Sequence, residues 1–286
     1  MSTGPTSLGA PGAGDLARAV PPASGGLPPG RPGSYGLRGM VRSEWTKLRT
    51  VRSTVWSLGL VVVLSIGISA LATAEARAHL SSGGIGDPTR LSLIGVFFAQ
   101  LVLGVLGILV MSSEYGTGTI RATLAATPRR PLVLVAKAVV FGAVSLIVAE
   151  VVAFLSYLLG QALLTAPAPH TTLSSPGALR AVVGSGLYLC VLGLLALSLA
   201  TIIRHTAGAI GAFVGVLLVA PIIVAALPSS IGNDIQRFLP DTIGRELISL
   251  HTGSHAFSPW VGFAVLCAYA VGLLVIGGIV LVRRDA

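Results

Sequence analysis

The sequence predicts an all-α membrane protein with six transmembrane helices. Of its 286 residues, 53% are hydrophobic and only 10% are charged, whereas roughly 25% are charged in a soluble globular domain. Six apolar runs reach the roughly 20 residues that a helix needs to cross the hydrocarbon core. Lipid offers the backbone no hydrogen bonds, and the runs lack the alternation of barrel strands, so helices are expected.

Residues 1–39 are predicted to form a disordered cytoplasmic tail that precedes a membrane domain at residues 40–286. The tail holds 10 Gly and 7 Pro and few large apolar side chains. Such a segment cannot bury enough apolar surface to fold. It also lacks the apolar core of a signal peptide, so cleavage is not expected.

A helical periodicity precedes the first apolar run and predicts an amphipathic helix in the membrane interface, with basic groups toward anionic headgroups. Its apolar stripe comprises Leu37, Val41, Trp45, Leu48, Val51 and Val55, and its basic residues outside the stripe are Arg38, Arg42, Lys47 and Arg49. The residues singled out in this helix are Trp45, Glu44, Lys47, Leu48 and Arg49. A juxtamembrane basic flank without a helix is the alternative.

Glu44 breaks this pattern because it projects into the apolar sector of the helix. A carboxylate in such a place needs a partner. The predicted partner is Arg121, Arg129 or Arg130, which follow in the loop between the second and third spans.

The six expected spans are residues 56–74, 91–111, 138–164, 178–203, 208–227 and 259–282. With the N-terminus inside, twelve Lys and Arg lie on the cytoplasmic side and five on the outer side. The positive-inside rule therefore predicts a multi-pass protein of the plasma membrane with both termini in the cytoplasm.

Glu150 is the one acid expected deep inside a span. Inserting an ionisable group at that depth costs at least about 2.5 kcal/mol, so this carboxyl should face helices or water rather than lipid. A contact in a transport path or gate is one interpretation. A hydrogen bond to a Ser, Tyr or Gln on a neighbouring helix is the other.

A polar and basic loop, SSEYGTGTIRATLAATPRRP, runs from Ser112 to Pro131 between the second and third spans. Thr119 can cap a short helix that begins at Ile120 and that Pro128 ends. Ile120 and Leu124 fall on one face of this helix and form a small apolar knob ringed by charge, which suits docking into a groove of another protein. An ordinary cytoplasmic turn is the alternative. The residues assigned to this contact are Glu114, Tyr115, Gly118, Thr119, Ile120, Arg121, Leu124, Arg129 and Arg130.

This loop resembles the first cytoplasmic loop of type-2 ATP-binding-cassette exporter permeases. The resemblance rests on an acid that ends the second span, Gly-Thr, a short helix, a Pro, paired Arg, and Lys137 early in the third span. It extends over residues 40–286, and SEWTKLRT resembles the elbow helix that opens these permeases. In residues 228–258, two short helical pieces, the second capped by Asp241, resemble their re-entrant extracellular helices. A folded surface loop is the alternative there.

The resemblance implies that the chain is a permease subunit that forms the substrate path of an exporter. The short helix after Gly118 would be the coupling helix that touches a separate ATPase subunit. That partner would bind ATP and Mg, this chain would bind no cofactor, and a second permease subunit would complete a homodimer or heterodimer.

Other function classes find less support in the residues. The two lysines, Lys47 and Lys137, lack the context of a phosphate-binding loop, and the two cysteines show no ligand spacing. The basic residues cluster beside apolar runs, which favours a lipid surface over nucleic acid. An intramembrane, peptidase-like enzyme could use Ser185, but no His lies in a predicted span. A channel or structural membrane subunit stays open, without a filter-like segment to support it.

Overall fold

The computed structural model describes residues 4, 37–79, 86–120, 130–250, 253 and 255–283, and for Arg130 the backbone alone. The elements described here belong to one compact unit, Gly36–Ala286. Most of the expected tail lies outside the described residues. Arg121, Leu124 and Arg129, in the loop between the second and third spans, also lie outside the described residues.

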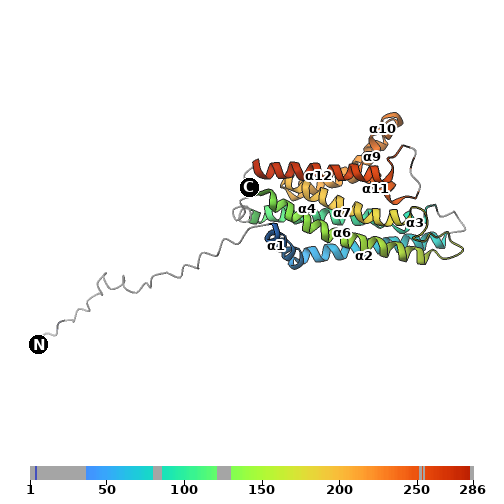
Figure 1. The fold of residues 1–286 in the computed structure, drawn as a ribbon, viewed down its shortest axis with the longest axis horizontal. Coiled ribbons are helices and arrows are strands. Elements are labelled where there is room, and N and C mark those ends of the chain that lie inside the picture. The colour runs from blue at the N-terminus through green and yellow to red at the C-terminus, as the bar shows by residue number, and fades with distance from the viewer. Residues whose placement is uncertain are drawn as a thin grey trace. The chain divides into compact units, whose positions relative to one another are not determined.

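Six helices are long and apolar enough to cross a membrane, and no strand occurs among the described residues (Figure 1). The helices that form them are α2 (Arg52–Ala78), α4 (Val96–Gly116), α6 (Arg130–Leu163), α7 (Ala178–Ile203), the fifth-span series α8 (Thr206–Val214), η2 (Gly215–Val219) and α9 (Ala220–Ala225), and α12 (Pro259–Arg283). The prediction of an all-helical, multi-pass membrane protein is confirmed.

Several expected span boundaries differ from the helix ends, and two of the starts were wrong for local reasons. The second span begins at Val96 rather than Leu91, because Asp87 caps a separate short helix, α3 (Pro88–Ser92), by accepting hydrogen bonds from two backbone N–H groups. The third span belongs to a helix that begins at Arg130, eight residues before the expected start at Ala138. The fourth and sixth spans agree with prediction to within one residue.

The central helix is α7, which contacts α4, α6 and α12 and is the most buried of the spans. Small residues allow this packing: a Cβ on Gly107 of α4 would lie 2.4 Å from the carbonyl oxygen of Gly193 in α7. By contrast, α2 and the fifth span expose large apolar side chains such as Leu71 and Ile222. These outer surfaces therefore suit contact with lipid or another membrane subunit.

The predicted N-terminal helix is present as α1 (Leu37–Thr50), which packs against α6 and the start of α2. Its expected continuation to Val55 was wrong, because Val51 has an extended backbone and α2 begins at Arg52. The buried side chains of α1 are Glu44 and Leu48, whereas Trp45 is 47% exposed. The face toward the bundle is thus centred on the carboxylate that interrupts the apolar stripe.

Two further short helices, α10 (Ser229–Gln236) and α11 (Pro240–Ile248), precede the sixth span as expected. The predicted cap by Asp241 was wrong: Leu239 is the N-cap, and Asp241 of the first turn pairs with Arg245 of the last turn. Helix α11 is packed against α7 and α12. Within this unit, α3, α10 and α11 lie toward the end of the bundle opposite α1 (Figure 1).

Candidate functional site

Four charged side chains meet where α1, α4 and α6 come together. Lys137 of α6 places its Nζ 2.6 Å from Glu44 Oε2 and 2.9 Å from Glu114 Oε1. Lys47 of α1 places its Nζ 2.6 Å from Glu44 Oε1 and 2.8 Å from the same Glu114 oxygen. The four residues, called the ion cluster below, join three helices through alternating charges.

The ion cluster is buried on one side and open on the other. The Lys137 side chain is 2% exposed, whereas that of Lys47 is 42% exposed. Buried charges are tolerated only when they are paired, and here two acids face two bases. Burial lowers the pKa of Lys47, but hydrogen bonds to Glu114 and Glu44 and their charges outweigh it, so that this pKa lies above its usual value.

The expectation that Glu44 needs a partner is confirmed, but the partners differ from the prediction. Each carboxylate oxygen accepts a hydrogen bond from a lysine, Lys47 or Lys137. Of the three predicted arginines, Arg121 and Arg129 lie outside the described residues, as does the side chain of Arg130.

Sequence reasoning missed the ion cluster because the third span was expected to begin just after Lys137. In the structure, α6 begins at Arg130, which puts Lys137 about two turns inside the helix. The available signal was composition: Lys47 and Lys137 are the only lysines among 19 basic residues.

The opposite side of the end of α4 makes a second set of contacts. Tyr115 lies beneath Arg204, whose guanidinium carbon is 5.5 Å from the centre of the ring. Arg204 follows α7 in a left-handed conformation, with φ of 59°, and its Nη2 donates to the carbonyl oxygen of Val280 in α12 at 3.1 Å. Glu114 and Tyr115 therefore tie the last turn of α4 to α1 and α6 on one side and to α7 and α12 on the other.

The chain enters the predicted contact loop directly after this turn. Gly118 has φ of +71°, and Thr117 Oγ1 donates to the carbonyl oxygen of Ser113 and shares a hydrogen bond with Thr119 Oγ1. Ile120, expected to form an exposed knob with Leu124, is only 2% exposed and packs into the core of this chain. Its side chain is thus occupied within the chain itself, which corrects the expectation of a free knob.

A groove lies beside the ion cluster, between α1, the start of α2 and α4. Its volume is about 510 Å³. It is lined by Glu44, Lys47, Leu48, Val51, Ser53, Thr54, Leu106, Leu109, Val110, Ser113, Glu114, Thr117, Thr119 and Lys137. We call it the α1–α4 groove.

Glu150 lies in the same helix as Lys137 but about 20 Å further along it. Its carboxyl packs against Gly186 of α7, where an added Cβ would lie 2.4 Å from the carboxyl carbon. The expected hydrogen bond to a Ser, Tyr or Gln is not found within the described part of the chain, where Oε2 is buried without a partner. Glu150 is therefore separate from the ion cluster.

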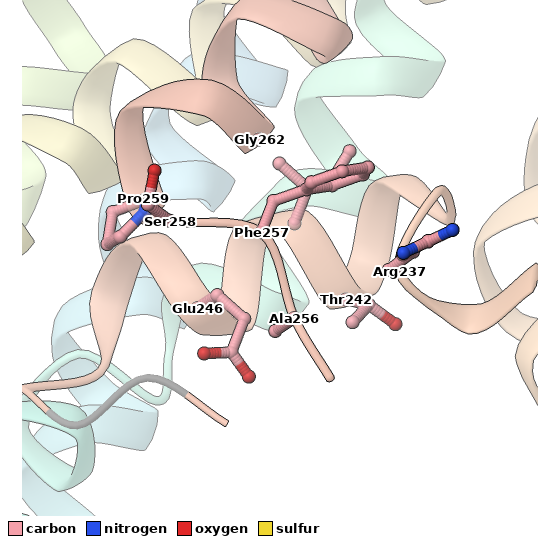
Figure 2. A pocket seen from close by; sticks show the side chains of 9 residues that line it. Arg237, Thr242, Glu246, Ala256, Phe257, Ser258, Pro259 and Gly262 are labelled. Atoms are coloured by element: carbon pink, nitrogen blue, oxygen red, sulfur yellow. The ribbon is translucent and has the colours of Figure 1, made fainter. Parts of the chain in front are cut away.

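The end of the bundle opposite α1 holds a small depression between α11 and the beginning of α12. Figure 2 shows Arg237, Glu246 and Phe257 around it. The Arg237 guanidinium lies over the rings of Phe238 and Phe257, at 5.2 and 5.5 Å from their centres. The depression has no room for a water molecule, so it does not offer a ligand site.

The structure also describes the surroundings of the candidate nucleophile and of possible metal ligands. Ser185, the candidate nucleophile, is buried and donates to the carbonyl oxygen of Ala181 in its own helix at 2.6 Å. No cluster of His, Cys, Asp and Glu able to hold a metal occurs over the described ranges.

A scan of protein-family models and a search of curated proteins found no match to the chain.

Proposed function

We propose that this chain is the membrane-spanning permease subunit of an ATP-binding-cassette exporter. A separate ATPase subunit binds ATP and Mg, and a second permease subunit, identical or different, completes the transport path. The observation that carries this proposal is the position of the last turn of α4. It precedes the basic loop and contacts α1, α6 and, through Arg204, α12.

The basic residues support a cytoplasmic assignment for this end. Arg38, Arg42 and Arg49 are in α1, Arg204 follows α7, and Arg283 ends α12. Under the positive-inside rule these groups face the cytoplasm, where an ATPase subunit resides. Helix α1 then serves as the interfacial elbow of the plasma-membrane protein, and the loop after Gly118 serves as the coupling helix.

The ion cluster gives the coupling a physical basis. A push on the loop displaces the end of α4, and Glu114 moves with Lys137 of α6 and Lys47 of α1 because it accepts hydrogen bonds from both. Separating these groups would leave charges unpaired at the membrane, which is costly. The three helices therefore move together and tilt the path from inward-facing to outward-facing. The unpaired carboxyl of Glu150, at the contact of α6 with α7, is the candidate contact in the path.

The test combines purification with coupling measurements. The chain is purified with the ATPase that accompanies it, and ATP hydrolysis and transport are measured in liposomes. We expect Glu114→Gln, Arg121→Gln and Gly118→Pro each to abolish transport and substrate-stimulated hydrolysis while membrane insertion stays normal. Arg38→Gln, at an exposed position of α1, is the control. Unchanged transport in all three variants, or transport without any ATPase, would overturn the proposal.

A further inference from the structure

The α1–α4 groove changes in character along its length. Its inner wall is apolar, formed on α4 by Leu106, Leu109 and Val110. The wall then becomes polar at Ser113 and Thr117. The lining that α4 provides therefore changes from hydrocarbon to hydroxyl groups over about 16 Å. A site with this gradient, bordered by two spans, matches an amphiphile that enters from the membrane.

At the polar end of the groove, Lys47 and Lys137 are balanced by Glu44 and Glu114, and further basic side chains lie beside the lining. Lys47 has three N–H donors, and its hydrogen bonds to Glu44 and Glu114 use two of them. Its side chain is 42% exposed at this end. Residues 37–52, four of which line the groove, contain five basic side chains and one acid. Within them, Arg49 and Arg52 are exposed beside the lining residues Val51 and Ser53.

We propose that the α1–α4 groove binds one anionic phospholipid. An acyl chain packs along Leu109 and Val110, and the phosphate accepts hydrogen bonds from Lys47 Nζ and the Ser53 hydroxyl. Arg49 and Arg52 supply the preference for an anionic over a zwitterionic headgroup, because basic groups near the membrane surface attract anionic lipid. This proposal requires only that the chain lies in a bilayer and is independent of the exporter assignment.

A second apolar groove shows why charge decides the choice of site. It lies between α6 and α12 and has a similar volume, about 540 Å³. Its lining includes Leu134, Val271 and Ile279, and its only charged lining residue within the described chain is Arg283. That groove can hold an acyl chain but offers little to distinguish one headgroup from another.

The test is native mass spectrometry of the full chain in detergent, titrated with phosphatidylglycerol or phosphatidylcholine of identical acyl chains. We expect one phosphatidylglycerol to bind more tightly than phosphatidylcholine, in a salt-sensitive manner. Arg49→Gln and Arg52→Gln should each weaken phosphatidylglycerol binding about fivefold and leave phosphatidylcholine unchanged. Leu109→Trp should fill the apolar part of the groove and remove the tight site.

The matched control is Ile222→Trp, a substitution at a lipid-exposed position of the fifth span, which should bind lipid as the wild type does. Equal binding of the two lipids by the wild type, or unchanged phosphatidylglycerol binding by Leu109→Trp, would refute the proposal. So would tight lipid binding that emerges only when residues 1–35 are deleted, because the N-terminal segment would then be the occupant.

Discussion

Lys137 Nζ and Glu44 Oε2 are 2.6 Å apart although 93 residues separate them in the sequence. Both side chains are buried, with 2% and 7% of their surface exposed. The pair attaches α1 to the third span, and each of its charges has a second partner, Glu114 for Lys137 and Lys47 for Glu44. The position of α1 on the bundle is therefore held by the ion cluster together with the packing of Leu48 into the core.

Glu44→Gln should lower stability strongly. The substitution leaves Lys137 with one acid instead of two, and removing one partner of a buried pair costs about 3 kcal/mol or more. Thermal unfolding in detergent measures the loss. Arg38→Gln, at an exposed position of the same helix, should stay within about 0.5 kcal/mol of the wild type. Equal and small effects of the two substitutions would mean that Glu44 is solvated.

The charge on Lys47 should stabilise the fold across the neutral range. Because its folded pKa is raised above the unfolded value of 10.5, its contribution is complete below that pH and is lost as the pH rises through the folded pKa. The measurement compares melting temperatures of the wild type and Lys47→Arg, since arginine keeps its charge to higher pH. The difference should be constant up to pH 10.5 and then shift in favour of the variant. A shift that begins near neutral pH would contradict this assignment.

Gly244→Ala should destabilise the packing of α11 on α7. An added Cβ would lie 2.4 Å from Cζ of Tyr188, which is fully buried and donates a 2.6 Å hydrogen bond to Gln100 Oε1. Such overpacking costs about 1–3 kcal/mol.

The control for this contact is Gly272→Ala in α12, where no atom lies within 4 Å of the added Cβ. Alanine there should stabilise the helix by up to about 1 kcal/mol. Opposite shifts in melting temperature are therefore expected for the two variants, and a loss of stability in both would count against the specific contact with Tyr188.

Gly118→Ala should strain the beginning of the loop without creating a clash. Its φ is +71° and no atom lies within 4 Å of an added Cβ, so the cost of about 1–2 kcal/mol comes from the backbone alone. Gly116→Ala, two residues earlier and equally open but helical, should be neutral or slightly stabilising. Limited proteolysis after Arg121 should accelerate only in Gly118→Ala. Identical cleavage rates would show that the left-handed turn does not control the loop.

Hydrophobic length and composition were sufficient to predict the six spans, because an apolar run of about 20 residues has few alternatives in a membrane. The starts of the second and third spans were predicted wrongly because local signals for a helix start differ there from the hydropathy pattern. Leu91 is apolar but belongs to α3, since Asp87 and Pro88 start a helix of their own. Arg130 and Pro131 are unfavourable residues for hydrocarbon, yet α6 already includes them.

The candidate site was predictable in part. The position of Glu44 on the helix showed that its carboxylate needs a partner, since that inference uses only periodicity and the cost of burial. The identity of the partner depends on how α1 packs against α6, a contact between residues far apart in sequence that periodicity does not encode. For the same reason, the burial of Ile120 within the chain was not foreseen.

Because Lys47 and Lys137 are the only lysines, the primary-amine chemistry of the chain, apart from its N-terminus, is confined to the ion cluster. An acylating reagent in water can reach the partly exposed ammonium of Lys47, whereas Lys137 is shielded by the surrounding helices. Modification of Lys137 therefore reports separation of α1 from α4 and α6. The native chain thus contains its own chemical probe for motion between these helices, without introduced cysteines or fluorophores.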